Sequence, residues 1–256
     1  MNKISIITIN LNNFEGLKRT IDSITIQVYR DYEFIVIDGG STDQSKTLLE
    51  LQNKNIKYWI SENDSGIYAA MNKGIKQATG DYLLFLNSGD YLVDSNTLSY
   101  VSTHLDLEFD ILLGNIISNG DIIKQKEKYT FLYFFEGFCI LHQASFIKRS
   151  LFNKIGLYST EYKIASDWEF FLKALFLFNA KYLYKDINIS IMEPNGISAQ
   201  DQNKQIIELE RNSIFEKNFP GFMPDYYFLR SILVSSKKMQ STFLFKVLKK
   251  MRLLKY

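Results

Sequence analysis

Apolar and polar positions alternate regularly through the first hundred residues of the chain. Short apolar runs predict four buried strands, at residues 4–9, 33–38, 56–60 and 82–86. Between them, apolar residues recur at helical spacing and predict helices at residues 14–27, after Ser41, and at residues 66–78. Strands that alternate with helices favour a mostly parallel sheet with helices on both faces. The predicted fold is therefore α/β and Rossmann-like, with its ligand site at the carboxyl ends of the strands.

The pattern becomes less regular after Asp90. It predicts helices at residues 95–104, 145–155, 167–178 and 202–215, and strands at 110–115, 122–126 and 181–189. No internal repeat or low-complexity segment interrupts it. We expect one domain over residues 1–225, followed by a helical C-terminal tail at residues 226–256.

Two of the predicted helices begin with the spacing of a capping box, in which an N-cap Ser is followed three residues later by Glu or Gln. Ser41 and Gln44 have this spacing, and so do Ser166 and Glu169. The second box would place Asp167 at the first helical position, where no structural role is required of it. That freedom favours a chemical role for Asp167, with Glu169 as the alternative carboxylate.

Composition narrows the class of protein. The chain has 256 residues, of which 46% are hydrophobic and 23% charged, as in ordinary globular proteins. Its single cysteine, Cys139, excludes an intrachain disulfide, and one cysteine with two histidines argues against a zinc site. The first residues resemble a strand rather than an export signal, and no apolar stretch has the length of a membrane span. These features predict a cytoplasmic protein.

Charge is distributed unevenly along the chain. The net charge is +2, but residues 236–256 contain seven basic residues and no acid, so −5 remains for the residues before them. On a helical wheel one side of this tail is apolar, with Phe243, Leu244, Val247, Leu248, Met251 and Leu254. A basic amphipathic helix suits an anionic membrane surface, although packing on the body or on a partner protein is the alternative. The acidic body argues against a nucleic-acid partner.

Polar side chains follow each of the four predicted strands of the first half. They are Thr8 and Asn10, Asp38, Asp64, and Asn87 to Asp90. The exits of parallel strands share one edge of a sheet, so we expect a ligand pocket there. Neither a Gly-x-Gly-x-x-Gly fingerprint nor a P-loop occurs in the sequence. The turn after Asp38 could also contact a ligand through the amino end of the following helix.

Three motifs in this half resemble those of family 2 glycosyltransferases with the GT-A fold. They are IVIDGGSTD at residues 35–43, ENDSGIYAAMNKG at 62–74 and GDYLLFLNSGD at 80–90. The likeness is greatest to bacterial enzymes of colanic-acid and O-antigen synthesis. It continues more weakly through HQASF at 142–146 and ASDWE at 165–169, to about residue 200, and the tail lies outside it.

The resemblance implies transfer of a sugar, with inversion, from a nucleotide-sugar to a saccharide or lipid-linked acceptor. Residues 1–92 would bind the nucleotide, and residues 93–225 would bind the acceptor. UDP is favoured over GDP or dTDP as the nucleotide. Donor-binding residues would be Thr8, Asn10, Asp38, Asp64, Asn72, Lys73, Asn87, Ser88 and His142.

A divalent cation, Mn²⁺ or Mg²⁺, would be held by Asp90 and Asn87, and Asp167 would be the general base. The family's Asp-x-Asp motif has its carboxylates at positions where this chain has Asn87 and Gly89. Asp90 is thus the only carboxylate of the turn, and we expect weaker metal binding than in relatives with both.

The overall expectation is an enzyme of surface-polysaccharide synthesis, peripheral on the inner face of a bacterial membrane, with a homodimer as a further hypothesis. A sugar nucleotidyltransferase is one alternative, but it requires a basic Gly-rich loop that residues 8–13 lack. A non-catalytic relative that acts as a binding module is the other.

Core packing or stacking on a ligand could explain the aromatic run Tyr129, Phe131, Tyr133, Phe134, Phe135 and Phe138.

Overall fold

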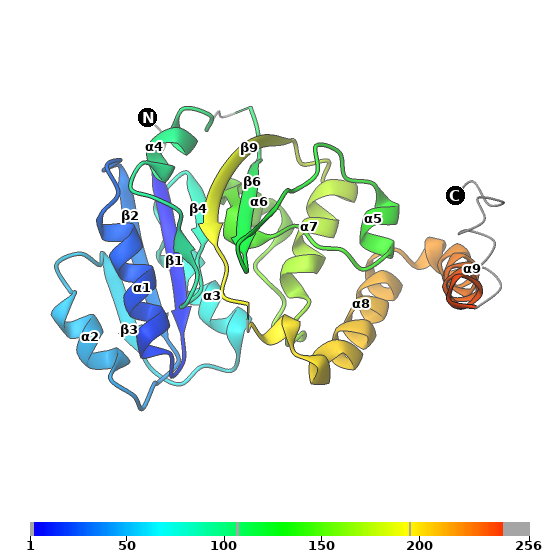
Figure 1. The fold of residues 1–256 in the computed structure, drawn as a ribbon, viewed down its shortest axis with the longest axis horizontal. Coiled ribbons are helices and arrows are strands. Elements are labelled where there is room, and N and C mark those ends of the chain that lie inside the picture. The colour runs from blue at the N-terminus through cyan, green and yellow to red at the C-terminus, as the bar shows by residue number, and fades with distance from the viewer. Residues whose placement is uncertain (1–2, 106–107, 195, 243–256) are drawn as a thin grey trace. The chain divides into compact units, whose positions relative to one another are not determined.

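One mixed β-sheet forms the centre of the first of two units into which the chain divides (Figure 1). The structure is a computed structural model that describes residues 3–105, 108–194 and 196–242. The units are Met1–Glu210 and Arg211–Tyr256. The α/β fold class predicted from the sequence is confirmed, because parallel strands alternate with helices throughout residues 1–86.

In the described residues the sheet has nine strands in the order β3-β2-β1-β4-β8-β6-β9-β5, with β7 paired to β6. The strands are β1 (Ile4–Asn10), β2 (Tyr32–Asp38), β3 (Tyr58–Ser61), β4 (Tyr82–Phe85), β5 (Tyr91–Leu92), β6 (Ile111–Ser118), β7 (Asp121–Ile123), β8 (Ser145–Lys148) and β9 (Tyr182–Ile191). The first four are parallel to one another, and β8 is antiparallel to both its neighbours, β4 and β6.

Helices cover both faces of the sheet. The helices of the first unit are α1 (Phe14–Thr25), α2 (Ser45–Leu51), α3 (Ile67–Gln77), α4 (Thr97–Ser102), α5 (Phe131–Phe135), α6 (Arg149–Ile155), α7 (Ser166–Phe176) and the start of α8 (Lys204–Asn218). Helix α9 (Met223–Ser241) belongs to the second unit. Alternate side chains of each strand explain the two layers. Ile6 and Leu84 pack with Leu17 of α1, whereas Ile7 faces Gly74 of α3. A Cβ atom on Gly74 would overlap Ile7, so glycine lets α3 approach the strands closely.

Several sequence predictions are wrong in the second half. Residues 145–148, predicted as the start of a helix, form strand β8, and helix α6 begins only at Arg149. Neither predicted capping box forms. Helix α2 begins at Ser45, four residues after Ser41, and α7 begins at Ser166 itself, with no side-chain cap.

A buried carboxylate ties the amino ends of the first strands together. Glu33 of β2 accepts hydrogen bonds from Lys3 Nζ (2.8 Å), Ser5 Oγ (2.6 Å) and the Thr79 backbone N–H (2.5 Å). Burial alone would raise the pKa of Glu33, but these donors lower it to about 2. The ionised carboxylate therefore joins β1, β2 and the turn before β4.

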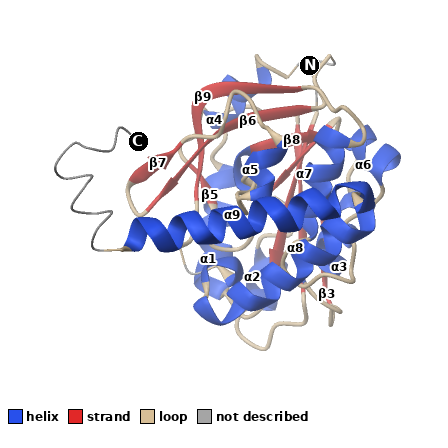
Figure 2. Cartoon of the chain, turned by 90° about the vertical axis from the view of Figure 1, so that its right-hand side faces the viewer, coloured by secondary structure: helices blue, strands red, loops and turns tan. Residues whose placement is uncertain are grey.

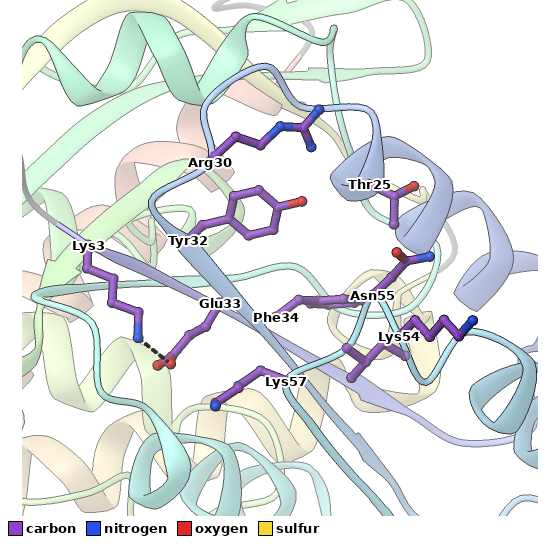
Figure 3. Close-up of a pocket in the computed structure, with 10 residues that line it drawn as sticks. Lys3, Thr25, Arg30, Tyr32, Glu33, Phe34, Lys54, Asn55 and Lys57 are labelled. Atoms are coloured by element: carbon purple, nitrogen blue, oxygen red, sulfur yellow. Dashed lines mark hydrogen bonds and ion pairs between the residues drawn. The ribbon is translucent and has the colours of Figure 1, made fainter.

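Figure 3 shows the Lys3–Glu33 pair in the wall of a cavity of about 560 Å³. The residues that line this cavity lie at or before the amino ends of β1, β2 and β3, together with Thr25 at the end of α1. The cavity is thus at the opposite edge of the sheet from Asn10 and Asp38, and it is not the predicted ligand site.

The second unit contains the end of α8, a short 3-10 turn and α9, which Figure 2 shows as one long helix. Within it Phe215 contacts the Tyr226 ring, and Arg230 donates a hydrogen bond to Asn212 Oδ1 (2.8 Å). No described helix is long and apolar enough to cross a bilayer. The amphipathic segment predicted from Phe243 onward lies outside the described residues, and the domain limit at residue 225 stays a prediction.

We predict that Glu33→Gln destabilises the fold by about 3 kcal/mol at pH 7, the free energy that corresponds to lowering the pKa from 4.5 to about 2. The folded-state pKa is the lower one, so the wild-type contribution is complete above about pH 5. It is lost as the pH falls toward 2. Urea unfolding at pH 7 and pH 3 measures the difference. Glu50→Gln, an exposed carboxylate of α2, is the control. A gap between wild type and Glu33→Gln that does not narrow with falling pH would contradict the assignment.

Candidate active site

Three strand exits are joined at the carboxyl edge of the sheet by the side chain of Asp38. Its carboxylate is fully buried and accepts hydrogen bonds from Asn10 Nδ2 (2.7 Å), Ser41 Oγ (2.5 Å) and Ser61 Oγ (2.6 Å). Burial would raise the pKa of Asp38, but the donors outweigh it and keep the pKa below its ordinary value. Ser41 therefore acts in this network instead of capping α2. Gly40, at φ +80°, lets the chain turn there.

A second charged group lies after β3. Lys73 of α3 forms ion pairs with Asp64 and Glu62, and the hydrogen bonds that its ammonium group donates to these two carboxylates raise its pKa. The side chain of Asp64 is 7% exposed, and that of Lys73 is 33% exposed. This group offers a cation at the edge of the sheet where an anionic ligand would lie.

Other predicted donor-binding residues have structural partners. Thr8 is fully buried and donates to the Leu86 carbonyl (2.7 Å) across β1 and β4. The amide of Asn72 donates to the Tyr158 carbonyl (2.8 Å) and accepts from the Tyr158 N–H (3.0 Å). These hydrogen bonds stabilise the sheet and the loop before α7. Contacts of Thr8 and Asn72 with a nucleotide-sugar stay predictions.

The turn after β4 contains Asp90, which is 4% exposed. One carboxylate oxygen accepts the Glu193 N–H (2.9 Å), and burial raises the pKa of Asp90 to about 6. The backbone carbonyl of Ser88 accepts from Asn13 Nδ2 (2.9 Å). Gly89 has φ +107°, and a Cβ atom there would lie 3.2 Å from Glu193 Cβ. The turn therefore requires glycine where the family has its second carboxylate.

Few side chains near the turn after β4 could coordinate a metal ion. No group of three or more His, Cys, Asp or Glu side chains in the described residues could hold a metal. However, Asn87 Oδ1 is buried and has no hydrogen-bond partner among the described residues. Mg²⁺ and Mn²⁺ are commonly held by one or two carboxylates with substrate phosphates and water. Asp90 with the Asn87 oxygen fits that minimal kind of site.

Asp167, at the second position of α7, lies in a hydrogen-bonded cluster. One carboxylate oxygen accepts from the Tyr68 hydroxyl (2.9 Å) and the Trp168 N–H (2.8 Å), and the other contacts His142 Nδ1 (3.0 Å). Burial would raise the pKa of Asp167, but His142 and Tyr68 lower it below its ordinary value. His142 Nε2 is 3.4 Å from Asn87 Nδ2, so the cluster reaches the turn after β4.

The loop before α7 is held in place by a residue that no sequence motif identifies. Glu210 of α8 accepts the N–H groups of Lys163 (2.6 Å), Ile164 (3.0 Å) and Ala165 (2.9 Å). Ser166 Oγ is buried and has no hydrogen-bond partner among the described residues. A carboxylate near a helix amino terminus is electrostatically favourable. Glu210 thus accepts backbone N–H groups at the amino end of α7, the role that was predicted for Ser166. Only the three-dimensional fold brings Glu210 to this helix end.

The aromatic run divides between two uses. Phe134 is fully buried, and Tyr129 is 9% exposed. Phe138 is 52% exposed and stacks on Tyr133 with ring centroids 5.0 Å apart. Its carbonyl accepts from Trp168 Nε1 (2.9 Å), beside Asp167 in sequence. Two of the six rings are buried in the core, three are partly buried, and Phe138 is presented to solvent.

Solved structures with this fold define the class of protein. S. aureus TarS 1–349 in complex with UDP-GlcNAc matches with a TM-score of 0.66 and 22% identity, over 84% of this chain and 66% of that one. The mannosyltransferase PcManGT from Pyrobaculum calidifontis, in complex with GDP-Man and Mn²⁺, matches with a TM-score of 0.60 and 13% identity, over 98% and 84%. The fold is the GT-A fold of glycosyltransferases.

Sequence comparison gives the family. The model of glycosyl transferase family 2 matches residues 5–167, so the chain belongs to this family. An uncharacterised glycosyltransferase of Mycobacterium tuberculosis is 38% identical over 183 residues, which are 67% of this chain and 68% of the relative. A PGL/p-HBAD biosynthesis glycosyltransferase of Mycobacterium bovis is 34% identical over 173 residues, 65% and 67% of the two chains.

We predict opposite outcomes for adding a carboxylate at the two positions of the missing motif. Asn87→Asp should bind Mn²⁺ about tenfold more tightly, because an anionic oxygen replaces a neutral one. Gly89→Asp should lower the free energy of unfolding by about 1–2 kcal/mol, since the turn requires positive φ and leaves no room beside Glu193. Electron paramagnetic resonance of free Mn²⁺ and urea unfolding measure the two effects. A stable Gly89→Asp protein with tighter Mn²⁺ binding would show that the turn tolerates the family motif.

Proposed function

We propose that this protein transfers a sugar from a nucleotide-sugar, with inversion, to a hydroxyl group of a saccharide or lipid-linked acceptor. The observation that carries the proposal is the environment of Asp167. Its carboxylate is buried yet kept ionised by three donors, and it is connected through His142 to the turn after β4. An ionised carboxylate at this place is ready to accept a proton from an acceptor hydroxyl.

The reaction is a single displacement. The acceptor oxygen forms a bond to the anomeric carbon as the bond from that carbon to the diphosphate oxygen breaks. The hydroxyl proton passes to Asp167, and the bonding electrons leave with the nucleoside diphosphate. The transition state has oxocarbenium character, so Asp167 must act from the face opposite the leaving group. No covalent intermediate is formed.

The donor would lie at the carboxyl edge of β1 to β4. Asp38 and Asp64 are the proposed nucleoside-binding carboxylates, and Lys73 supplies positive charge. UDP is the proposed nucleotide, and the likeness in fold to a UDP-GlcNAc complex supports it. Asn10 and Ser88 complete the donor side of the site.

Asp90 and Asn87 are the residues proposed to hold a divalent cation, Mn²⁺ or Mg²⁺. A bound cation supplies charge neutralisation for the leaving diphosphate. With a single carboxylate in the turn, Asp90 and Asn87 would leave most of the cation's ligands to be supplied by the donor's phosphates and water.

The proposed setting is the cytoplasmic side of a bacterial membrane, in the synthesis of surface polysaccharide. Residues 236–256 carry seven positive charges, which suit an anionic membrane surface where a lipid-linked acceptor would be found. A non-catalytic binding module is the second candidate, and the single carboxylate of the turn at Asp90 is the observation that favours it.

Turnover of a donor panel separates the two candidates. UDP-, GDP- and dTDP-sugars are incubated with the protein, with and without Mn²⁺, and release of the nucleoside diphosphate is measured. We expect release from a UDP-sugar that increases with Mn²⁺. Binding of a nucleotide-sugar without turnover of any donor, by a folded protein, would favour the binding module.

We predict that Asp167→Asn lowers the rate of transfer at least 100-fold, because a general base contributes roughly 10²–10⁴-fold. The affinity for the donor, measured by calorimetry, should change less than about twofold, since the base acts in the transition state. Glu169→Gln is the matched control. That neighbouring carboxylate lies 3.9 Å from Lys173 and should be replaceable with little loss of activity. An active Asp167→Asn enzyme would remove Asp167 from this role.

We predict that deletion of residues 243–256 weakens binding to vesicles containing anionic lipid at least 100-fold. The deletion removes five of the seven basic residues of the tail, each worth about 1 kcal/mol near an anionic surface. Sedimentation with phosphatidylglycerol vesicles measures the effect, and phosphatidylcholine vesicles are the control. Unchanged binding of the shortened protein would exclude the tail as the membrane contact.

A further inference from the structure

We infer that His142 is a positioning residue for Asp167: its Nδ1–H orients the carboxylate and keeps it ionised, and the ring does not contact the nucleotide. The inference rests on the proposed function, in which Asp167 is the general base. It replaces the sequence-based hypothesis that His142 binds the donor.

The backbone around His142 is held firmly in place. His142 begins a 3-10 turn, His142–Ala144, that leads directly into β8. Gln125 accepts the Leu141 N–H (3.0 Å) and donates to the Gly114 carbonyl of β6 (3.1 Å). Ser190 of β9 donates to the Gln143 carbonyl (2.7 Å). Strands of the sheet therefore hold the backbone that carries the imidazole, and a donor on a fixed backbone can orient a carboxylate at a smaller cost in conformational entropy.

Both ring nitrogens of His142 already have partners within the protein. An ionised carboxylate only accepts hydrogen bonds, so Nδ1 must carry the hydrogen that faces Asp167 Oδ2 at 3.0 Å. In the neutral ring, Nε2 is then an acceptor, and Asn87 Nδ2 faces it at 3.4 Å. This arrangement turns Asn87 Oδ1 away from the ring. It leaves no ring nitrogen of His142 for a nucleotide.

The charge of Asp167 depends on its donors. The carboxylate and the imidazole are each 14% exposed, so solvent does little to stabilise the ionised form. Tyr68 is the second side-chain donor, and Tyr158 and Cys139 are the other ionisable groups on this side. Burial raises the pKa of Tyr68 and Tyr158, so neither brings a charge. Asp90 faces His142 from the turn after β4. The loss of His142 Nδ1 would therefore raise the pKa of Asp167.

Two substitutions separate the functions of the two ring nitrogens. The amide nitrogen of His142→Asn falls near the position of Nδ1, and the amide oxygen of His142→Gln falls near the position of Nε2, where it can accept from Asn87 Nδ2. His142→Asn thus retains a donor to Asp167 but loses the contact with Asn87. His142→Gln retains the contact with Asn87 but leaves the oxygen of Asp167 without its donor.

We expect His142→Asn to keep kcat within about fivefold of wild type, with the same acid limb in its pH–rate profile. His142→Gln should lose about 100-fold in kcat, the usual result of a misplaced catalytic group. Its acid limb should move to higher pH, and its KM for the donor should stay unchanged. Thermal unfolding of both variants monitors the fold.

Three results would overturn the inference. The first is wild-type kcat and an unmoved acid limb in His142→Gln. The second is a raised donor KM in either variant at unchanged kcat, which indicates a nucleotide contact. The third is equal loss of activity in both variants with no change in the ionisation of Asp167, which indicates that the ring itself takes part in the chemistry.

A readout that needs no turnover separates this inference from the proposed function. The Asp167 carboxyl carbon is titrated by NMR in ¹³C-labelled protein and assigned by its absence in Asp167→Asn. The inference predicts a higher Asp167 pKa in His142→Gln than in wild type or His142→Asn, and the same pKa in all three would overturn it. Full activity of Asp167→Asn would instead refute the proposed function, while the titration still decides whether His142 holds the carboxylate.

Discussion

The in-register parallel pairing of β1 with β2 and β4 is the constraint on which the rest of the structure depends. It places Asn10 beside Asp38, and it continues past β4 through the hydrogen bond from the Ser88 N–H to the Ile9 carbonyl. A shift of one residue would reverse the face of every side chain in a strand, and the buried apolar residues on both faces forbid it. The polar exits must therefore meet at one edge.

The antiparallel strand β8 adds the other half of the site to this edge. Because β8 pairs with β4, the turn before it brings His142 to Asn87, and α7 brings Asp167 to His142. The residues proposed to bind the donor come from consecutive strands, whereas His142 and the proposed base, Asp167, come from segments about 55 to 80 residues beyond Asn87 in the chain. The two halves also meet at Tyr68 of α3, whose hydroxyl donates to Asp167 (2.9 Å).

The same distinction explains what the sequence could predict. Strands β1, β2 and β4 were predictable because each is a buried apolar run that ends in a polar turn. Strand β8 was not predictable, since only the two middle residues of its four are apolar and the strand leads straight into a helix. Family motifs identified Asp38, Asp90 and Asp167 as candidates, and the structure places them at one edge of the sheet or in contact with residues there.

Competing hydrogen-bond partners account for the errors at the helix starts, and for α7 that partner is distant in sequence. The spacing of Ser41 and Ser166 fits a capping box, but the hydroxyl of Ser41 binds Asp38, and the donors before α7 bind Glu210. Spacing reports only local geometry. A carboxylate brought in from another element can take over a cap, and no pattern within a ten-residue window contains that information.

The two buried carboxylates nearest His142 differ because their donors differ. Burial raises the free energy of the ionised form of both. For Asp167, hydrogen bonds donated by His142, Tyr68 and the Trp168 N–H offset the cost of burying the charge, and its pKa falls below the ordinary value. Asp90 has weaker compensation, and its pKa rises to about 6. Environments that give two carboxylates different pKa values suit them to different chemical roles. Asp167 is already an anion and suits a proton acceptor, whereas Asp90 gains most from a neighbouring positive charge.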